Sequence, residues 1–249
     1  MADHYNQPDL ANLYDDENGW DSSADFYRDL ALEGGARSVL DLGCGTGTVT
    51  RGIVAALGGV GVGVDPARPM LEVARRKTAA EAVEWIEGDA RTMRLERKFD
   101  FILMTGHAFQ AMLSDEDQAA LLATVAAHLA PDGRFGFDTR NPAAEEWLEW
   151  TPELSLRRVE TAMFGPVDIH DEAAMQPNGR ILDVVEHYHA RNDGRRFRAD
   201  FQLRFTPQAE LAARVTEAGL AVEHCFGDWQ RQPFGEDAQE IIVVGRLAR

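Results

Sequence analysis

A glycine-rich segment is the most specific chemical feature of the sequence. It reads Val39-Leu40-Asp41-Leu42-Gly43-Cys44-Gly45-Thr46-Gly47, between an expected strand and an expected helix. Glycines let a ligand approach the backbone, and a helix N-terminus offers free N–H groups to a carboxylate or phosphate. The spacing matches neither the dinucleotide fingerprint G-x-G-x-x-G nor a phosphate loop ending in G-K-[ST]. Because Asp41 repels phosphate and suits an ammonium group, the loop favours a ligand with an amino-acid end.

Carboxylates also follow later strands of the expected sheet. Asp65 ends the apolar run 60–64, and Asp89 follows the run 83–87. An open α/β sheet binds its ligand at the carboxyl ends of its strands. There Asp65 can accept both hydroxyls of a ribose, and Asp89 can accept from an exocyclic amine such as that of adenine. A lone Asp is more often a helix cap or a solvated loop residue, but three in successive strand ends favour a nucleoside-type ligand.

A parallel sheet wrapped by helices would bring these side chains to one edge. Short apolar runs alternate with helical patterns in the first half of the chain, as such a sheet requires. We expect strands at 38–42, 60–64, 83–87, 99–104 and 134–138. Helices are expected at 48–57, from Pro69, and from a capping box at Ser114 to a stop at Pro131-Asp132-Gly133.

The alternation of strand and helix patterns ends in the second half of the chain. The segment 141–150 suits a short helix, and 158–205 indicates about four antiparallel strands separated by glycine-containing turns. A further helix is expected where Thr206 caps and Pro207 occupies the first turn. Two more strands, 221–226 and 240–245, complete the pattern.

Composition restricts the partners. The 249 residues carry 42 Asp and Glu against 25 Lys and Arg, a formal net charge of −17. Nucleic-acid binding usually needs the reverse balance, so we expect no nucleic acid and no membrane as a partner. No apolar run approaches the ~20 residues of a spanning helix, and the segment 1–10 lacks a signal-peptide pattern, so we expect a cytoplasmic protein. Cys44 and Cys225 are expected as free thiols, and without zinc-ligand spacing no metal is expected.

The sequence resembles the class I S-adenosylmethionine-dependent methyltransferases. The stretch from Val39 to Gly47 matches the family's first motif at every position, Phe99–Met104 matches its fourth strand, and Leu129–Arg134 matches the segment leading into the fifth. The likeness covers about Leu10 to Asp138 and resumes at the last helix and two strands. It implies an α/β fold with a seven-stranded Rossmann-like sheet, mostly parallel with a reversed last strand, helices on both faces, and an antiparallel β insertion after strand five.

The resemblance divides the chain into three segments. Residues 1–140 form an N-terminal cover and the first part of the core, 141–205 form an antiparallel lid, and 206–249 complete the core. The lid resembles that of small-molecule methyltransferases, such as those acting on amino sugars or glycine.

The resemblance also implies a cofactor, S-adenosylmethionine, and residues that bind it. In the family, the carboxylate matching Asp41 supports the methionine amino group, and the one matching Asp65 holds the ribose hydroxyls. Met70 would pack on adenine, and Asp89 with Ala90 matches the adenine-edge motif. The other positions expected at the cofactor come from the glycine loop, the end of the fourth strand and the N-terminal cover: Gly43, Gly45, Met104, Thr105 and Tyr14.

His107 is the candidate catalytic residue. It directly follows the fourth strand, on the methyl-acceptor side of this fold. A sulfonium is already electrophilic, so the protein must chiefly align the acceptor and exclude water, and an imidazole can take a proton from it. The alternative is that His107 contacts the substrate or caps a helix without moving a proton. His170, His187 and His189 are expected on lid strands, with His187 and His189 solvated on one face.

Three functions compete. The first is methyl transfer to a nitrogen, oxygen or carboxylate of a small-molecule acceptor by in-line displacement. The second is a non-catalytic S-adenosylmethionine-binding sensor or scaffold. The third is a nicotinamide-dependent oxidoreductase, which Gly47 and Thr48 argue against. The sequence leaves the acceptor open, and it allows a monomer or a homodimer because lid sheets sometimes pair between subunits.

Overall fold

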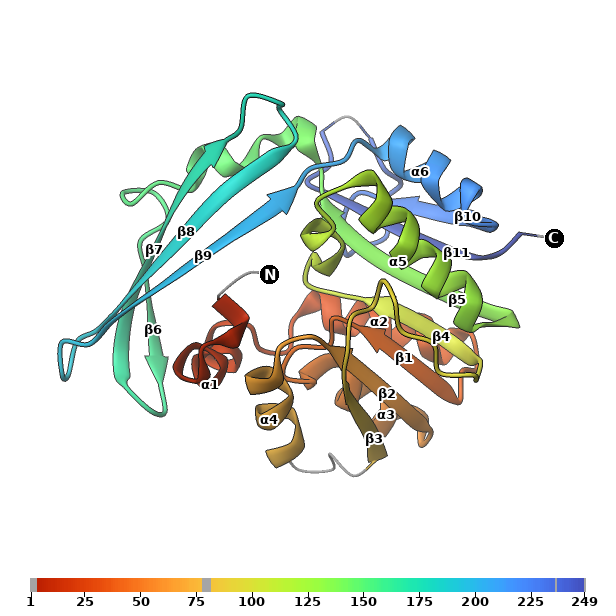
Figure 1. The fold of residues 1–249 in the computed structure, drawn as a ribbon, viewed down its shortest axis with the longest axis horizontal. Helices are drawn as coiled ribbons and strands as arrows, with labels where there is room; N and C mark the ends of the chain where they lie inside the picture. The colour runs from red at the N-terminus through yellow and green to blue at the C-terminus, as the bar shows by residue number, and fades with distance from the viewer. Residues whose placement is uncertain (1–3, 78–81, 236, 249) are drawn as a thin grey trace.

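A seven-stranded sheet forms the core of the protein (Figure 1). The computed structural model describes residues 4–77, 82–235 and 237–248. The strand order is β10-β11-β5-β4-β1-β2-β3. Its members are β1 (Ser38–Leu42), β2 (Val60–Asp65), β3 (Val83–Glu87), β4 (Phe99–Met104), β5 (Leu129–Arg140), β10 (Leu220–Phe226) and β11 (Glu240–Leu247). β1 to β5 pair in parallel and β11 runs antiparallel to β5 and β10, which confirms the expected Rossmann-like sheet with a reversed last strand.

Helices cover both faces of this sheet. The α-helices are α1 (Pro8–Glu17), α2 (Ser22–Glu33), α3 (Thr48–Leu57), α4 (Arg68–Arg76), α5 (Asp115–His128) and α6 (Gln208–Glu217). Val39 of β1 joins the buried cluster of α2 and α3, which includes Tyr27 and Ile53. The next residue, Leu40, joins the cluster of α5 and α6 on the other face, with Leu122. This alternation along β1 explains why the strand is apolar on both sides.

Local sequence sets the helix boundaries. Ser114 caps α5 by accepting a hydrogen bond from the Asp117 backbone N–H at 3.0 Å, and Asp21 caps α2 through the backbone N–H groups of Ser23 and Ala24. α3 ends at Gly58, whose φ is 58°. The predicted bounds of α3, β1, β3 and β4 are confirmed at both ends.

Several predicted boundaries are wrong. The strands β2, β10 and β11 extend one or two residues beyond their predicted limits, and three further differences have a local cause. β5 begins at Leu129, before the predicted start at 134, and includes Pro131-Asp132-Gly133. The register against β4 shifts between the pairs Phe99–Leu129 and Phe101–Arg134, so these three residues form an irregularity in the strand, and continuous pairing begins at Arg134. The segment 141–150 forms two 3-10 helices, Pro142–Ala144 and Glu146–Glu149, separated by a left-handed Glu145. Pro207 is the N-cap of α6, one position before its predicted place.

The lid is a separate antiparallel sheet in the order β6-β7-β8-β9. Its strands are β6 (Arg157–Thr161), β7 (Gly165–Met175), β8 (Ile181–Ala190) and β9 (Arg196–Arg204). Figure 1 shows this sheet arching away from the core, with α1 beneath it. The expected insertion of four strands after β5 is confirmed; the proposed segment limits 1–140, 141–205 and 206–249 stay a prediction.

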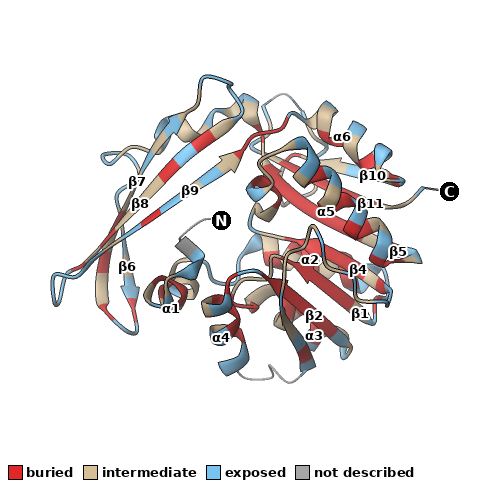
Figure 2. Cartoon of the chain, viewed as in Figure 1, coloured by how far each residue is buried: buried red, intermediate tan, exposed pale blue. Residues whose placement is uncertain are grey.

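Burial separates the two parts of the molecule. The strands β1, β2, β4, β5 and β11 of the core sheet are mostly buried, whereas the edge strands β3 and β10 are mostly part-exposed (Figure 2). Along the lid strands buried residues alternate with more exposed ones, as expected for a sheet with one covered face. The covered face contributes Ile169 and Tyr188 to a cluster with Leu10 and Leu13, so α1 packs against the lid as well as the core.

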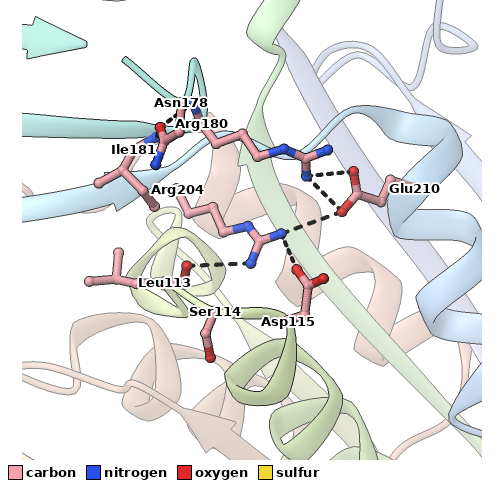
Figure 3. Close-up of a pocket in the computed structure, with 8 residues that line it drawn as sticks. All are labelled: Leu113, Ser114, Asp115, Asn178, Arg180, Ile181, Arg204 and Glu210. Carbon is pink, nitrogen blue, oxygen red and sulfur yellow. Dashed lines mark hydrogen bonds and ion pairs between the residues drawn. The ribbon is translucent and has the colours of Figure 1, made fainter. Parts of the chain in front are cut away.

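A charged network connects the base of the lid to the core (Figure 3). Arg204, at the end of β9, is only 4% exposed and pairs with Asp115 of α5 and with Glu210 of α6. Arg180, in the turn before β8, reaches the same Glu210 at 2.8 Å. These side chains border a cavity of about 340 Å³. The network ties the end of β9 and the turn before β8 to α5 and α6 of the core.

Among the described residues, no helix is long and apolar enough to cross a membrane.

Candidate active site

The glycine loop lies between β1 and α3, at the carboxyl edge of the core sheet. Gly43 and Gly45 have φ values of 84° and 53°, which L side chains rarely adopt. The backbone N–H of Gly43 donates to the Val64 carbonyl at 2.8 Å, which ties the loop to β2. A Cβ on Gly43 would lie 3.0 Å from the Ala108 Cβ. The loop therefore needs glycine both for its conformation and for its closeness to the segment after β4.

Asp41 presents an unsatisfied oxygen beside this loop. Its carboxylate is buried, and Oδ2 accepts the Thr50 hydroxyl at 2.5 Å. Oδ1 is also buried, and within the described part of the chain it has no hydrogen-bond partner. Burial raises the pKa of Asp41 to about 7, and the nearby Asp65 and Asp138 carboxylates add to the shift. A ligand N–H or a bound water would satisfy this oxygen.

Asp65 holds the loop in place from the end of β2. Oδ2 accepts the Gly45 backbone N–H at 2.8 Å, and Oδ1 accepts the Ala67 backbone N–H at 2.8 Å. Burial raises its pKa in spite of these two bonds. Each carboxylate oxygen can accept a further hydrogen bond, so Asp65 can both shape the loop and bind a ligand hydroxyl.

Tyr14 and Met70 line the open side of Gly45. A Cβ placed on Gly45 would lie 3.6 Å from the Met70 Cε and 3.9 Å from a Tyr14 ring carbon. A Cβ placed on Gly106, beyond β4, would lie 3.9 Å from the Tyr14 hydroxyl. Burial raises the pKa of Tyr14, with the Tyr5 and Asp65 charges contributing. Tyr14 therefore lies across the edge of the sheet, between the glycine loop and the segment after β4.

Asp15 fastens α1 over the loop. Its Oδ1 accepts the hydroxyls of Thr46 and Thr48 at 2.5 and 2.9 Å. Its Oδ2 is 2.6 Å from the Lys77 Nζ, at the end of α4. These contacts position Tyr14, the preceding residue, and sequence reasoning missed them because the partners are far apart in the chain.

Asp89 lies after β3 and is paired within the protein. Its carboxylate makes a bidentate contact with Arg91, at 2.9 Å to Nε and 2.6 Å to the terminal nitrogen. Arg91 also contacts Asp117 of α5 at 2.5 Å, and its guanidinium holds the pKa of Asp89 below its ordinary value. Ala90 packs against the core cluster of α5 and α6. The expected contact of Asp89 and Ala90 with adenine stays a prediction.

Met104 is the buried last residue of β4, and Thr105 follows it. The chain then turns sharply through His107, whose φ of 59° is left-handed. The His107 backbone N–H donates to the Asp138 Oδ2 at 2.8 Å, and the other Asp138 oxygen accepts the Tyr27 hydroxyl at 2.7 Å. Asp138 of β5 thus holds the turn that presents the His107 ring.

The His107 ring meets Glu240, the first residue of β11. Its Nε2 lies 3.1 and 3.0 Å from the two Glu240 carboxylate oxygens, and 3.7 Å from the Asp138 Oδ2. Burial lowers the pKa of His107 to about 4, with the Arg140 guanidinium contributing, and burial raises the pKa of Glu240 to about 7. Burial therefore favours the neutral form of the His107 imidazole. Glu240 went unnoticed in the sequence because it only appeared to begin an apolar strand.

An acidic cluster lies between α1 and the inner face of the lid. Arg157 of β6 pairs with Glu17 of α1, with Asp171 at 2.9 Å, and with Glu186 at 3.8 Å. Three carboxylates thus surround one guanidinium. Burial raises the pKa values of Glu17 and Asp171.

Tyr5 connects this cluster with the glycine loop. Although 36% of the residue is exposed, burial of its hydroxyl raises the pKa of Tyr5 to about 12, and the Glu186 and Asp65 charges contribute. The Tyr5 ring also meets the Tyr14 ring edge to face, with centroids 6.2 Å apart, so Tyr5 lies beside the residue that crosses the edge of the core sheet.

Comparison with known proteins agrees with this architecture. A methyltransferase-domain family model matches residues 39–133. A cypemycin N-terminal methyltransferase from a Streptomyces species is 39% identical over 217 residues, which span 84% of this chain and 82% of that protein. The chain belongs to the class I S-adenosylmethionine-dependent methyltransferases. The methyltransferase is also 28% identical over 210 residues to a dTDP-3-amino-3,4,6-trideoxy-alpha-D-glucopyranose N,N-dimethyltransferase of Streptomyces venezuelae, covering 82% of this chain and 83% of that enzyme.

Solved structures extend the likeness to the whole fold. Streptomyces venezuelae DesVI superposes on the methyltransferase with a TM-score of 0.74 at 25% identity, covering 96% of this chain and 98% of the other. The CcbJ methyltransferase of Streptomyces caelestis gives a TM-score of 0.78 at 22% identity, covering 99% and 98%. The cofactor of this methyltransferase is S-adenosylmethionine, and the oxidoreductase hypothesis is set aside.

The residues at the sheet edge suit that cofactor. The unpartnered Asp41 oxygen is buried beside the glycine loop, where an ammonium group or its bound water could donate to it. The Asp65 carboxylate has capacity for hydroxyl donors, and Met70 and Tyr14 give an apolar wall next to Gly45. The side chains at this edge are acidic or apolar, and this combination suits a nucleoside that carries a positively charged sulfonium.

Proposed function

We propose that this methyltransferase methylates an amine nitrogen, either the amino terminus of a peptide or the amino group of a small molecule such as an amino sugar. The observation that carries the proposal is the 39% identity to an enzyme named for N-terminal methylation. The relative from Streptomyces venezuelae is named for N,N-dimethylation of an amino sugar. A nitrogen acceptor is the chemistry that the two names share.

In this proposal the cofactor is held at the glycine loop. Asp41 receives the methionine amino group and Asp65 the ribose hydroxyls, while Met70 packs on the adenine. The backbone of Gly43 and Gly45 contacts the methionine portion, and Tyr14 closes the groove. When bound, the cofactor supplies an electrophilic methyl group on a sulfonium, and its carbon–sulfur bond breaks as the nitrogen–carbon bond forms.

The acidic lid cluster favours an amine over a carboxylate as the acceptor. In this cluster three carboxylates surround one guanidinium, that of Arg157. The excess negative charge makes the inner face of the lid attractive to cations. A negatively charged acceptor would be repelled there. The charge of the lid thus supports an amine acceptor over a carboxylate, two of the acceptors that the sequence left open.

His107 takes the proton that the methylated amine must lose. Glu240 engages Nε2, so the neutral ring donates Nε2–H to that carboxylate and presents the lone pair of Nδ1. Once Nδ1 accepts a proton, the Glu240 and Asp138 carboxylates, 3.0 and 3.7 Å from Nε2, partly offset the cost of a buried imidazolium. His107 is the base, and Glu240 is the residue that orients it.

The test is methyl transfer from labelled S-adenosylmethionine to a panel of short peptides with free amino termini and a panel of amino sugars. Each amine is paired with its N-acetylated form. We expect label in at least one free amine and none in its acetylated partner. Transfer confined to hydroxyl or carboxylate compounds would contradict the amine assignment and leave the methyltransferase activity standing.

A further inference from the structure

Two histidines and a glutamate gather on the outer face of the lid, away from the acceptor side. His170 and Glu172 alternate along β7, and His187 of β8 is the direct cross-strand partner of His170. The opposite face of the same strands carries Ile169 and Tyr188, which pack toward α1. The outer group is therefore separate from the methyl-transfer site.

The three side chains are close enough to share one ion. One potential ligand atom from each lies within 4.8 Å of the other two. His187 Nε2 is 3.4 Å from the Glu172 Oε1, and two ligands at the usual zinc distances on a tetrahedral ion are also about 3.4 Å apart. The His170 and His187 rings are stacked, with centroids 4.7 Å apart and planes 11° apart.

One of these nitrogens has no hydrogen bond to satisfy it. His187 Nε2 is buried, and among the described residues it has no hydrogen-bond partner. A buried imidazole nitrogen without a partner is unfavourable. The rest of the group is open to water, since the side chains of His187 and Glu172 are 30% and 55% exposed. An ion can therefore enter from solvent and keep water ligands.

Neighbouring positive charges are held by their own carboxylates. Arg198 of β9 faces His187 across the sheet and makes a bidentate pair with Asp200, at 2.8 and 2.6 Å. Arg158 of β6 pairs with Asp168, at 2.5 and 3.0 Å. The hydrogen bonds of both guanidinium groups therefore go to other carboxylates, and the Glu172 charge acts on Arg198 only at longer range. A cation bound at Glu172 would compete with this longer-range attraction alone.

We propose that His170, Glu172 and His187 bind one divalent transition-metal ion of the zinc class, with water completing the coordination. Two imidazoles and one carboxylate suit zinc, nickel, cobalt or copper, whereas magnesium and calcium prefer oxygen ligands. The ion would link β7 to β8. The same strands carry Asp171 and Glu186 on the inner face, so binding would stiffen the part of the lid that faces the acceptor.

The experiment is a calorimetric titration of metal-free, full-length protein with zinc chloride, and separately with magnesium chloride. We expect one zinc ion to bind with a micromolar dissociation constant and magnesium to give no signal. His170→Ala and His187→Ala should each weaken zinc binding at least tenfold. His189→Ala is the matched control on the same face of β8, and it should bind zinc as the unmodified protein does.

A second readout identifies the coordination. Cobalt chloride should give the intense visible absorption of a tetrahedral ion, and His187→Ala should lose it while keeping its circular dichroism spectrum. Absence of zinc binding, or equal binding by the His170→Ala/His187→Ala double variant, would overturn the proposal. Because neither readout uses cofactor or acceptor, the result is independent of the proposed methyl transfer.

Discussion

The His107 imidazole and the Glu240 carboxylate meet across the carboxyl edge of the core sheet, with Nε2 3.0 Å from the nearer oxygen. The two residues are 133 positions apart in the chain. They are brought together because β11 inserts antiparallel beside β5, with Glu240 opposite Arg140. The reversed strand of this fold thus supplies the partner of the candidate base.

Removing the His107 imidazole should slow turnover and leave the affinity for the cofactor nearly unchanged. We expect His107→Asn to lower kcat about 100-fold or more, since a positioned base contributes that much. Glu240→Gln should lower kcat less, because it can still orient the ring. With the pKa of His107 lowered to about 4, the imidazole is already neutral at pH 6.5, so a rising limb of kcat near pH 7 should come from ionisation of Glu240, whose pKa is about 7, and should be lost in Glu240→Gln.

A buried structural histidine provides the control for these kinetics. His128 accepts the Leu95 backbone N–H at 2.9 Å, far from the groove. His128→Asn should lower stability and leave kcat of the folded fraction unchanged. A His107→Asn enzyme with full turnover would contradict the assignment of the base.

Asp65 should be needed for cofactor affinity. Asp65→Ala removes the proposed ribose contacts, and the loss of two charge-assisted hydrogen bonds should weaken S-adenosylmethionine binding by about 2 to 4 kcal/mol in calorimetry. The variant should also lose stability, because Asp65 accepts the Gly45 and Ala67 backbone N–H groups.

Asp100→Ala is a control that separates the loss of stability from the loss of cofactor affinity. The Asp100 Oδ2 likewise accepts two backbone N–H groups, from Arg37 and Ser38, at 2.9 and 3.0 Å. It lies beside the amino end of β1, away from the groove. Asp100→Ala should lose stability comparably and retain cofactor affinity. Equal affinity of Asp65→Ala and the unmodified protein would remove the ribose assignment.

Asp41 should make stability depend on pH. Its folded pKa, about 7, is above the ordinary 3.8, so its contribution is fully present below 3.8 and is lost as pH rises through about 7. Asp41→Asn has no such titration. The Tm of this variant relative to the unmodified protein should therefore rise between pH 4 and pH 7 and level off above pH 7. The difference in the free energy of unfolding should change by about 1.4 kcal/mol per pH unit in that range. A constant difference in Tm would show that Asp41 is already ionised at low pH.

The lid anchor should contribute to folding. Arg204→Leu removes a nearly fully buried guanidinium that contacts Asp115, Glu210 and the Leu113 carbonyl. We expect a loss of about 2 to 4 kcal/mol in urea unfolding. Arg180→Ala, at a side chain 48% exposed, removes a surface contact to the same Glu210 and should cost under about 1 kcal/mol. Equal losses in the two variants would contradict a special role for the buried arginine.

The sequence predicted the parts of the fold that depend on local pattern. The strands β1, β3 and β4 and the helix α3 have strong periodicity and clear caps or glycine stops, so their limits were accurate. The start of β5 was not, because the strand extends back to Leu129 across Pro131-Asp132-Gly133, where the turn signal coincides with a shift in the register against β4.

The site was predictable only where residues sit in one motif. The glycine loop with Asp41 and Asp65 follows from positions at successive strand ends. The Asp15 contacts that fasten α1, the Arg157 cluster and Glu240 depend on contacts between distant segments. Their residue types are ordinary surface types, so nothing in the local sequence marks them.

The most direct test of the account is a single turnover on protein preloaded with methyl-labelled S-adenosylmethionine. A free-amine acceptor from the panel and its N-acetylated form are mixed with the loaded protein in parallel, and the products are analysed by mass spectrometry. The account predicts that the free amine gains one methyl group on nitrogen while the acetylated form gains none. Equal labelling of both forms, or no labelling of any amine by protein that binds the cofactor, would contradict it.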